Sequence, residues 1–364
     1  MKWFILKIAV IALKIIYIPF QLLGIQNKIT YITRQYDNPS LDYLLLKEEV
    51  EKRDKDIKNV MLARKISGGK HSTITYPFHM LTQMYHLATS RYVILDGYCI
   101  AASILPHKAD TKVIQIWHAS AALKKFGYQT LDKPSGSSSR MAEIMKMHCN
   151  YDVVFALSNT TANHYCQAFN VSRDKVRLIG MPHYSILKDF DAKDAMEAAY
   201  PVLKEKKNIL YMPTFRKGKD VEIQSLIDNF DFEKYNFIAR LHPLETAAKD
   251  DERVIYDDKF STYDWINLAD VIIADYSSLI VECAWLKKKM FFYLYDYDEY
   301  ASDPGVNVDY EEEGLMELSF KDASQLMDIL NSEYKWDTLN AFSDRYVEVD
   351  ADRSVETFVD FMLG

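Results

Sequence analysis

The sequence lacks several features by which common protein classes are identified. Its 364 residues include only four cysteines (Cys99, Cys149, Cys166 and Cys283), and no two of them form a CxxC pair. This scarcity disfavours a disulfide framework and a structural zinc site, and it fits a reducing compartment such as the cytoplasm. Basic residues are not in excess, since the formal net charge is −8. A general nucleic-acid-binding protein is therefore not expected.

Several phosphate-binding signatures are also missing. No GxGxxG fingerprint occurs, which argues against a nicotinamide enzyme. Residues 67–73 (SGGKHST) resemble part of a P-loop, but Arg64 stands where that motif requires its first glycine. A kinase or NTPase is therefore excluded. No DxD motif or carboxylate cluster lies near the polar motifs described below, so we expect no metal ion and no other cofactor.

Short apolar runs alternate with helical patterns along most of the chain. Because these runs are continuous rather than alternating, they indicate parallel strands covered on both faces, as in βαβ units. One series comprises residues 92–96, 112–117, 152–157 and 175–180, and the other comprises 208–213, 236–241, 253–256, 270–274 and 290–294. The polar helical stretch 188–208 separates them. We therefore predict an α/β, GT-B-like fold in which two doubly wound parallel-sheet domains, residues 25–190 and 191–364, face a cleft. The last helix is a candidate to pack back on the first domain.

Residues 1–24 (MKWFILKIAVIALKIIYIPFQLLG) are apolar apart from Lys2, Lys7, Lys14 and Gln21. No cleavage pattern of small residues follows, so a removable signal peptide is not predicted. Lys7 and Lys14 fall on one helical face, which suits an amphipathic helix lying in a membrane interface. A spanning anchor is disfavoured by the central lysine. Burial against the domain is an equally strong alternative.

Four polar motifs directly follow predicted strands: WHAS at 117–120, MPTFR at 212–216, RLHP at 240–243 and ADYSS at 274–278. Ligands of open α/β sheets bind outside the carboxyl ends of the strands. A single strand-end histidine is usually structural, but four such motifs together favour a functional site. We place His118 where a strand passes into a helix. The loop 131–141 (LDKPSGSSSRM) is a candidate mobile lid.

The motif ADYSS predicts an anion site at the start of a helix. Ser277 and Ser278 stand where backbone N–H groups are exposed, although simple helix capping would need the same residues. Glu282 follows Ser278 by four residues, on the same helical face, and could meet a ribose. Cationic side chains from the other motifs can neutralise a diphosphate without a metal: Arg216, Lys217, Lys219 and His242. Arg240 is a candidate for an exposed, solvated charge at a strand end rather than a phosphate ligand.

The ordered set QIWHASAALKKFG, YMPTFR, RLHP and DVIIADYSSLIVECAWLKKKMFFYLYDYDEY resembles the CDP-glycerol glycerophosphotransferases of teichoic acid synthesis. The resemblance covers roughly residues 90–345. It implies a metal-independent phosphotransfer by a peripheral enzyme at the cytoplasmic face of a bacterial membrane. A hydroxyl of a polyprenyl-diphosphate-linked saccharide would attack the β-phosphorus of CDP-glycerol, and CMP would leave. Residues 25–190 would then hold the acceptor and residues 191–364 the CDP donor.

The resemblance also implies roles for individual residues. His118 would be the general base, a role that suits an imidazole. His242 would be a second catalytic residue, and would bind the diphosphate with three others: Arg216, Ser277 and Ser278. Asp275 and Glu282 would orient the site and contact the ribose. Lys124 and Lys125 would face lipid phosphates, and the small residues after His118 would leave room for the acceptor hydroxyl.

Two departures from the family pattern bear on the substrate. Polymerases of the family usually read WHGTP, whereas Ala-Ser-Ala-Ala follows His118, which favours the priming step. The family often has Gly-x-Pro-Arg where this chain has Gly180-Met181-Pro182-His183, and the lost arginine leaves acceptor and donor details open. CDP-ribitol or another CDP-polyol, or elongation rather than priming, stays an alternative. So do a GT-B glycosyltransferase using a nucleotide sugar and a scaffold with a decayed site.

Overall fold

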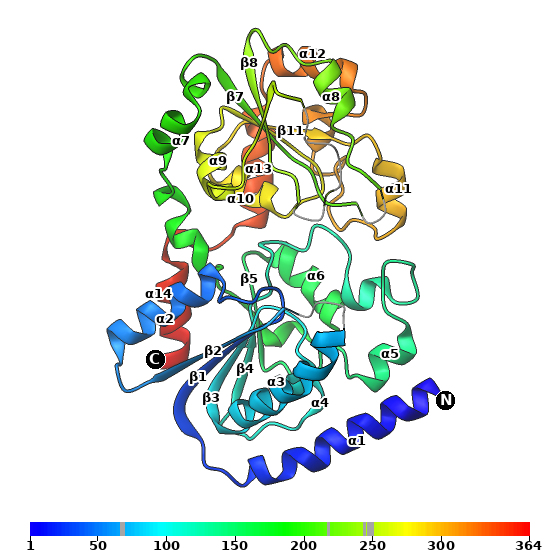
Figure 1. Cartoon of the computed structure of the whole chain (residues 1–364), viewed down its shortest axis with the longest axis vertical. Coiled ribbons are helices and arrows are strands. Elements are labelled where there is room, and N and C mark those ends of the chain that lie inside the picture. Colours follow the sequence, from blue (N-terminus) through cyan, green and yellow to red (C-terminus); the bar gives the residue numbers. More distant parts are fainter. Residues whose placement is uncertain (66–69, 217–218, 243–244, 246–250) are drawn as a thin grey trace. The chain divides into compact units, whose positions relative to one another are not determined.

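The computed structural model describes residues 1–65, 70–216, 219–242, 245 and 251–364, without the side chains of residues 70–75. Lys217, Pro243 and residues 67–69 of the 67–73 segment therefore lie outside the described residues. The chain divides into two compact units, one of residues 1–185 with 348–364 and one of residues 186–347 (Figure 1).

The first unit is built on a six-stranded parallel sheet of order β2-β1-β3-β4-β5-β6. Its strands are β1 (Gln26–Thr33), β2 (Lys58–Ala63), β3 (Ser90–Leu95), β4 (Lys112–Gln115), β5 (Val153–Ala156) and β6 (Val176–Leu178). Its helices are α1 (Lys2–Gln21), α2 (Leu41–Arg53), α3 (Lys70–Thr89), α4 (Ile100–Ile104), α5 (Ser139–Ile144), α6 (Asn159–Phe169) and α14 (Ser354–Leu363).

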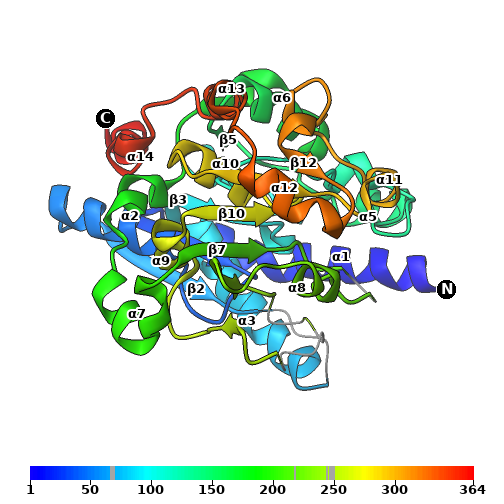
Figure 2. The same ribbon diagram turned by 90° about the horizontal axis from the view of Figure 1, so that it is seen from above.

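The second unit holds another six-stranded parallel sheet, of order β12-β11-β10-β7-β8-β9. Its strands are β7 (Lys207–Met212), β8 (Tyr235–Ala239), β9 (Val254–Tyr256), β10 (Val271–Ala274), β11 (Met290–Tyr293) and β12 (Ser319–Phe320). Its helices are α7 (Lys193–Ala199), α8 (Gln224–Asp228), α9 (Thr262–Leu268), α10 (Leu279–Trp285), α11 (Tyr297–Ser302), α12 (Leu326–Asn331) and α13 (Trp336–Tyr346). Figure 2 shows β7 and β10 side by side in this sheet. The two doubly wound parallel sheets confirm the predicted fold class.

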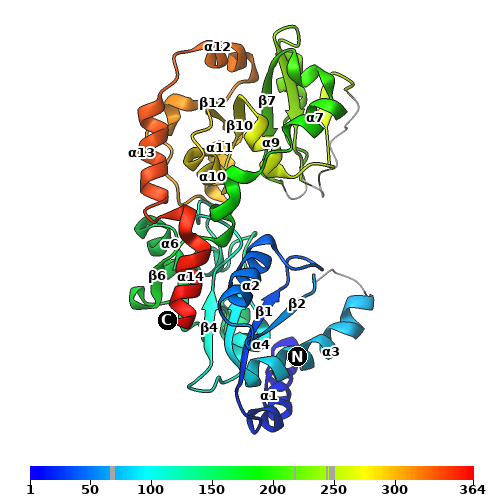
Figure 3. The same ribbon diagram turned by 90° about the vertical axis from the view of Figure 1, so that its left-hand side faces the viewer.

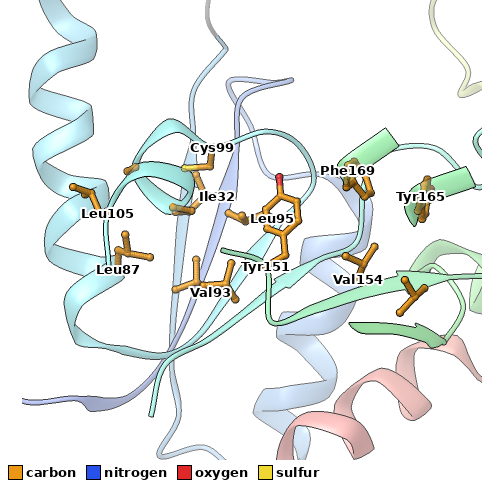
Figure 4. Packing of buried hydrophobic residues seen from close by; sticks show 14 of the residues in the cluster. Ile32, Leu87, Val93, Leu95, Cys99, Leu105, Tyr151, Val154, Tyr165 and Phe169 are labelled. Carbon is orange, nitrogen blue, oxygen red and sulfur yellow. The ribbon is translucent and has the colours of Figure 1, made fainter. Parts of the chain in front are cut away.

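Each face of the first sheet carries its own apolar core. On one face, strand residues such as Val93 and Val154 pack against helix residues such as Leu87 and Phe169 (Figure 4). On the other face, strand residues pack against α2 and α14. Strands covered on both faces are expected to be continuously apolar, as the sequence of β3 and β5 is.

Two strands of the first sheet were not predicted, because they are not apolar runs. The strand β1 carries Lys28 and Thr30 in buried positions, where Lys28 Nζ donates to Thr89 Oγ1 at 2.5 Å and Thr30 Oγ1 lies 2.8 Å from Ser90 Oγ. The charged stretch 44–65 holds the end of α2 followed by β2. Long-range polar partners thus stabilise a strand that composition alone does not indicate.

Residues 348–364 belong to the first unit rather than the second, although they follow the whole of the second unit in sequence. Figure 3 shows α14 alongside α2. Phe358 is fully buried, with its ring 4.6 Å from that of Phe155, and the Tyr92 hydroxyl donates to the Met362 carbonyl oxygen. The last helix is therefore an integral layer of the first unit.

The helix α1 packs on the first unit along one stripe only. Tyr17 is 1% exposed and belongs to the core, with Leu13 and Phe20 packed beside it. The opposite side exposes large apolar residues, Phe4, Ile5, Ile8, Ile11, Ile15, Ile16 and Ile18. By length and composition α1 could cross a membrane, with 6% of its apolar window buried.

Candidate active site

The second sheet places its polar motifs at a topological switch point. The chain runs from β7 to β8 and β9 on one side and returns to β10 on the other, so the carboxyl ends of β7 and β10 lie next to each other. Asp275 follows β10 and is 1% exposed. Its carboxylate accepts hydrogen bonds from the Thr214 backbone N–H at 2.9 and 3.0 Å. Asp275 therefore joins the two strand ends from within the protein.

Arg216 is held in buried ion pairs. Its side chain is 6% exposed and lies 2.9 Å from Asp275 Oδ2 and 2.8 Å from Asp296 Oδ2. It also donates to the Thr214 carbonyl oxygen and stacks over the rings of Tyr276 and Tyr300. Both carboxylates hold the guanidinium in place, so we revise the predicted phosphate contact of Arg216 to a role in positioning the strand ends.

Ser277 and Ser278 are half-buried at the start of α10, while Glu282 is 3% exposed. Ser278 makes no side-chain capping hydrogen bond, and Ser277 Oγ lies 3.4 Å from the Leu279 N–H. The two hydroxyls are therefore within reach of a ligand. Glu282 faces the interior, on the helix that packs against α13, and this burial argues against the expected ribose contact.

His242 follows β8 and is exposed, with its ring 4.9 Å from that of Phe215. Arg240 is not a solvated charge, because it donates to the Asp257 carbonyl oxygen. Lys219 lies 2.5 Å from Glu299. A cavity of about 430 Å³ beside Lys219 and Arg216 is lined largely by acidic side chains (Asp220, Asp296, Asp298 and Glu299). This lining does not suit a diphosphate, so Ser277, Ser278 and His242 are the better candidates for contacting one.

His118 lies at the carboxyl end of the first sheet, two residues after Ile116. Its Nδ1 is 2.8 Å from the Asp96 carbonyl oxygen, which can only accept a hydrogen bond. The Gln35 amide lies 3.4 Å from the same nitrogen. Nδ1 therefore carries the proton of the neutral ring, and Nε2 has its lone pair available to accept another.

The residue before His118 is held in an unusual backbone conformation. Trp117 has φ = 61°, in the left-handed region that residues other than glycine rarely adopt. Its ring is stacked on that of Phe126, with centroids 4.6 Å apart, and packs edge-on against that of Phe169 at 5.1 Å. The Trp117 backbone N–H donates to Gln115 Oε1 at 2.8 Å. Such strain, roughly 1–3 kcal/mol, persists only where packing enforces it, and here Phe126 and Phe169 pack against the Trp117 ring.

The electrostatics keep His118 neutral near physiological pH. Its pKa is lowered from the ordinary value because surrounding protein desolvates the ring, although part of the residue stays exposed. The hydrogen bond to Asp96 acts in the opposite direction, and the nearby charge of Lys124 lowers the pKa further. An unprotonated ring nitrogen on an exposed residue is what a general base requires.

The stretch after His118 differs from two expectations. No helix follows, since residues 118–126 are irregular and a 3₁₀ turn begins at Gly127. The small residues 120–122 are buried rather than open, and Ser120 Oγ donates to Met181 Sδ at 3.6 Å. Of the loop 131–141, residues 139–141 begin α5. Lys124 and Lys125 are half-buried, and Lys124 is the one close enough to influence His118.

His183, which stands where the family often has an arginine, is paired with an acidic residue. His183 is 5% exposed, and its backbone N–H and Nδ1 lie 2.8 and 2.9 Å from Asp42 Oδ1, near the start of α2. Sequence reasoning missed this pair, and it also missed Gln35 and Asp96. Asp96 is 3% exposed, and burial raises its pKa to about 7. Gln35 follows the unpredicted strand β1, so no sequence signal pointed to it.

The four cysteines are all free thiols. Within the residues that the structure describes, no group of three or more His, Cys, Asp or Glu side chains is placed to hold a metal ion.

Residues 17–364 match the family model of the CDP-glycerol:poly(glycerophosphate) glycerophosphotransferases. The chain belongs to this family. It is 31% identical to a teichoic acid ribitol-phosphate primase of Bacillus spizizenii, over 85% of this chain and 84% of that protein. It is 26% identical to a teichoic acid glycerol-phosphate primase of Bacillus subtilis, over 79% of this chain and 77% of that protein.

Solved structures agree on the fold of this glycerophosphotransferase family member. The wall teichoic acid polymerase TagF superposes with a TM-score of 0.73 over 99% of this chain and 96% of that one, at 17% identity, in a crystal described as soaked with CDPG. A UDP complex of MnaA from S. aureus superposes with a TM-score of 0.61, at 14% identity, over 92% of this chain and 95% of that chain. These similarities confirm the GT-B-like architecture.

Proposed function

We propose that this chain transfers a polyol phosphate from a CDP-linked polyol to a hydroxyl of a prenyl-diphosphate-linked saccharide, releasing CMP, as a priming step of teichoic acid synthesis. The observation that carries the proposal is the 31% identity to a ribitol-phosphate primase over 84% of that protein's length. The geometry of His118 supports it, because a hydroxyl acceptor needs a base to take its proton.

His118 would act as the general base. As the acceptor oxygen bonds to the β-phosphorus, its proton passes to His118 Nε2, and the bond from that phosphorus to the bridging oxygen breaks. CMP leaves with the bonding electrons. Because Nδ1 donates to the fixed Asp96 carbonyl oxygen, the imidazolium formed in this step keeps its orientation and a hydrogen-bonded partner.

The second unit would hold the donor diphosphate. Ser277 and Ser278 offer hydroxyl groups at the β7/β10 switch point, and His242 offers a further donor at the end of β8. Asp275 and Arg216 would keep these strand ends together without touching the ligand, because both are buried in mutual contacts. Charge stabilisation by fixed donors needs such rigid support.

CDP-ribitol and CDP-glycerol both stay candidates for the donor. The sequence motifs alone favoured CDP-glycerol, whereas the identity to the ribitol-phosphate primase (31%) exceeds that to the Bacillus subtilis glycerol-phosphate primase (26%). We therefore place CDP-ribitol first. The 31% identity to the ribitol-phosphate primase also exceeds the 28% identity to the poly(ribitol-phosphate) polymerase of Bacillus spizizenii, which is a reason to favour priming over elongation.

The deciding experiment incubates the purified full chain with CDP-ribitol or CDP-glycerol and a lipid-linked saccharide analogue, and measures CMP release. Release with one CDP-polyol supports the proposal and identifies the donor. Release with neither, together with turnover of a nucleotide sugar, would instead make the chain a glycosyltransferase.

The role of His118 has its own test. The His118→Ala variant should lose nearly all turnover while its affinity for the CDP-polyol, measured by calorimetry, stays close to wild type. Turnover close to that of the wild type would remove His118 from the role of base.

A further inference from the structure

The first sheet also has a topological switch point, and sequence reasoning did not find it. From β1 the chain passes to β2 on one side, while β3 lies on the other side of β1. Ligands of doubly wound sheets bind at the carboxyl ends of the strands at such a point. The residue that follows β1 is Arg34, and the next one, Gln35, lies against His118.

Among the residues that the structure describes, the guanidinium of Arg34 has no anionic partner. It donates one hydrogen bond to the Tyr98 carbonyl oxygen and lies over the Tyr98 ring at 5.5 Å. Its Nε is buried and has no acceptor, and no carboxylate lies within ion-pairing distance of it in the part of the chain described. Arg216, in the second unit, shows the usual arrangement, with two carboxylates around a buried guanidinium.

Two more groups that have no hydrogen-bond partner among the described side chains come from α3. Gln83 is 0% exposed, and its amide nitrogen has no acceptor, while its carbonyl oxygen accepts from Cys99 Sγ at 3.8 Å. The Tyr76 hydroxyl is likewise buried without a partner. Figure 4 shows Cys99 beside Ile32, close to the end of β1.

These side chains lie around Tyr98 and Cys99, since Arg34 contacts Tyr98 and Gln83 contacts Cys99. Burial raises the pKa of the Tyr76 hydroxyl to about 12, and the charge of Arg34 and the amide of Gln83 both act to lower it. The Gln83 amide thus faces the Tyr76 hydroxyl, which still has its own O–H to donate. Leaving such groups unsatisfied is costly, so folded proteins rarely bury several of them together unless a ligand or water completes them.

We propose that Arg34, Tyr76 and Gln83 form an anion-binding subsite that holds phosphate oxygens of the acceptor on the His118 side of the reaction. This inference rests on the proposed function, in which the acceptor carries a diphosphate and the second unit holds the donor. Phosphate oxygens accept hydrogen bonds only, which matches the unpaired guanidinium, amide N–H and hydroxyl groups.

The test compares two acceptor analogues in steady-state kinetics with the full chain. One is a saccharide with an alkyl diphosphate, and the other is the same saccharide with a neutral alkyl chain. Arg34→Gln should raise the KM for the diphosphate acceptor about tenfold to a hundredfold, the value of a charge-assisted hydrogen bond, and leave the KM for the neutral acceptor and for the CDP-polyol unchanged. Tyr76→Phe should raise the same KM by less.

The matched control is Arg91→Gln, which removes an exposed guanidinium from the amino end of the same sheet. It should change no kinetic constant. Arg34→Lys keeps the charge but loses the planar fork, and it should fall between wild type and Arg34→Gln. Thermal unfolding of every variant shows whether the fold is retained.

A binding measurement without donor separates this inference from the proposed function. The diphosphate analogue and inorganic pyrophosphate should both bind the wild type, and Arg34→Gln should bind both weakly. Pyrophosphate binding that Arg34→Gln leaves unchanged, or an equal rise in KM for both acceptors, would overturn the subsite. Absence of CMP release from the wild type with any CDP-polyol would overturn the proposed function instead.

Discussion

At the scale of single residues, the environment of His118 predicts a pH profile. Because its pKa lies below the ordinary value of 6.5, the ring is neutral at pH 7, and protonation begins to remove the base only at lower pH. Turnover should therefore rise with pH through an acidic limb centred below pH 6.5. Lys124→Gln removes a charge that lowers this pKa, so its limb should move to higher pH in kcat/KM profiles of the full chain.

Lys125→Gln is the control for that profile. The two lysines are adjacent and equally half-buried, but the charge of Lys125 is not among the influences on His118. Its profile should match that of the wild type. An equal shift in both variants would mean that net charge, rather than the local field of Lys124, sets the limb.

Arg216 should matter to stability as well as to the site. Arg216→Met leaves Asp275 and Asp296 without their counter-charge inside the second unit. Breaking a buried pair in this way costs about 3–5 kcal/mol of unfolding free energy. Denaturant unfolding, followed by circular dichroism, should show this loss as a lower midpoint.

Lys219 provides the comparison for Arg216. Its ion pair with Glu299 is exposed on both sides, with side-chain exposures of 63% and 66%. Lys219→Met should therefore cost about 1 kcal/mol or less. Equal losses of unfolding free energy for the two variants would contradict the assignment of Arg216 as a buried residue that positions the strand ends.

The sequence could indicate which residues stand at strand ends, but not what they meet there. His118, Asp275 and Ser277 were found because each follows an apolar strand. The partner of Arg216, Asp296, lies 80 residues away, so its ion pair could not be predicted and Arg216 was read as a phosphate ligand. Glu282 is likewise buried on α10, a helix that packs against α13, an element distant in sequence.

At the scale of elements, the position of α14 makes a prediction about folding. Phe358 is fully buried against the first sheet, whereas Phe361, on the same helix, is 41% exposed. Phe358→Ala should lower the unfolding free energy by about 3–5 kcal/mol, the usual cost of emptying a buried aromatic site. Phe361→Ala should cost much less. Similar values for both would mean that α14 is not docked as described.

The strands also show where the pattern of apolar residues is insufficient to predict an element. Apolar runs identified β3 to β11, since strands covered on both faces carry few polar residues. The strand β1 escaped detection because Lys28 and Thr30 are buried through partners supplied by α3 and β3. Because β1 was not predicted, the switch point beside it was not predicted either, and Arg34 and Gln35 were missed.

At the scale of the whole molecule, the exposed face of α1 makes a prediction about membrane binding. One stripe of the helix, including Tyr17, packs in the core of the first unit, while the opposite face exposes seven large apolar residues. Lys7 and Lys14 are exposed beside that face. An apolar face flanked by lysines is typical of a helix lying in the interface, which suits an enzyme whose proposed acceptor is a lipid.

Point substitutions test this surface better than deletion of residues 1–24, because deletion would also remove Tyr17 from the core. Ile8→Glu combined with Ile15→Glu places charges on the exposed face only. This variant should sediment poorly with vesicles containing anionic lipid while keeping the wild-type melting temperature. Leu44→Glu changes a comparably exposed residue on α2, at 48%, and should sediment like the wild type. If the α1 variant sediments as well as the wild type, the membrane contact lies on another surface, whereas a loss in both variants would point to a general effect of charge.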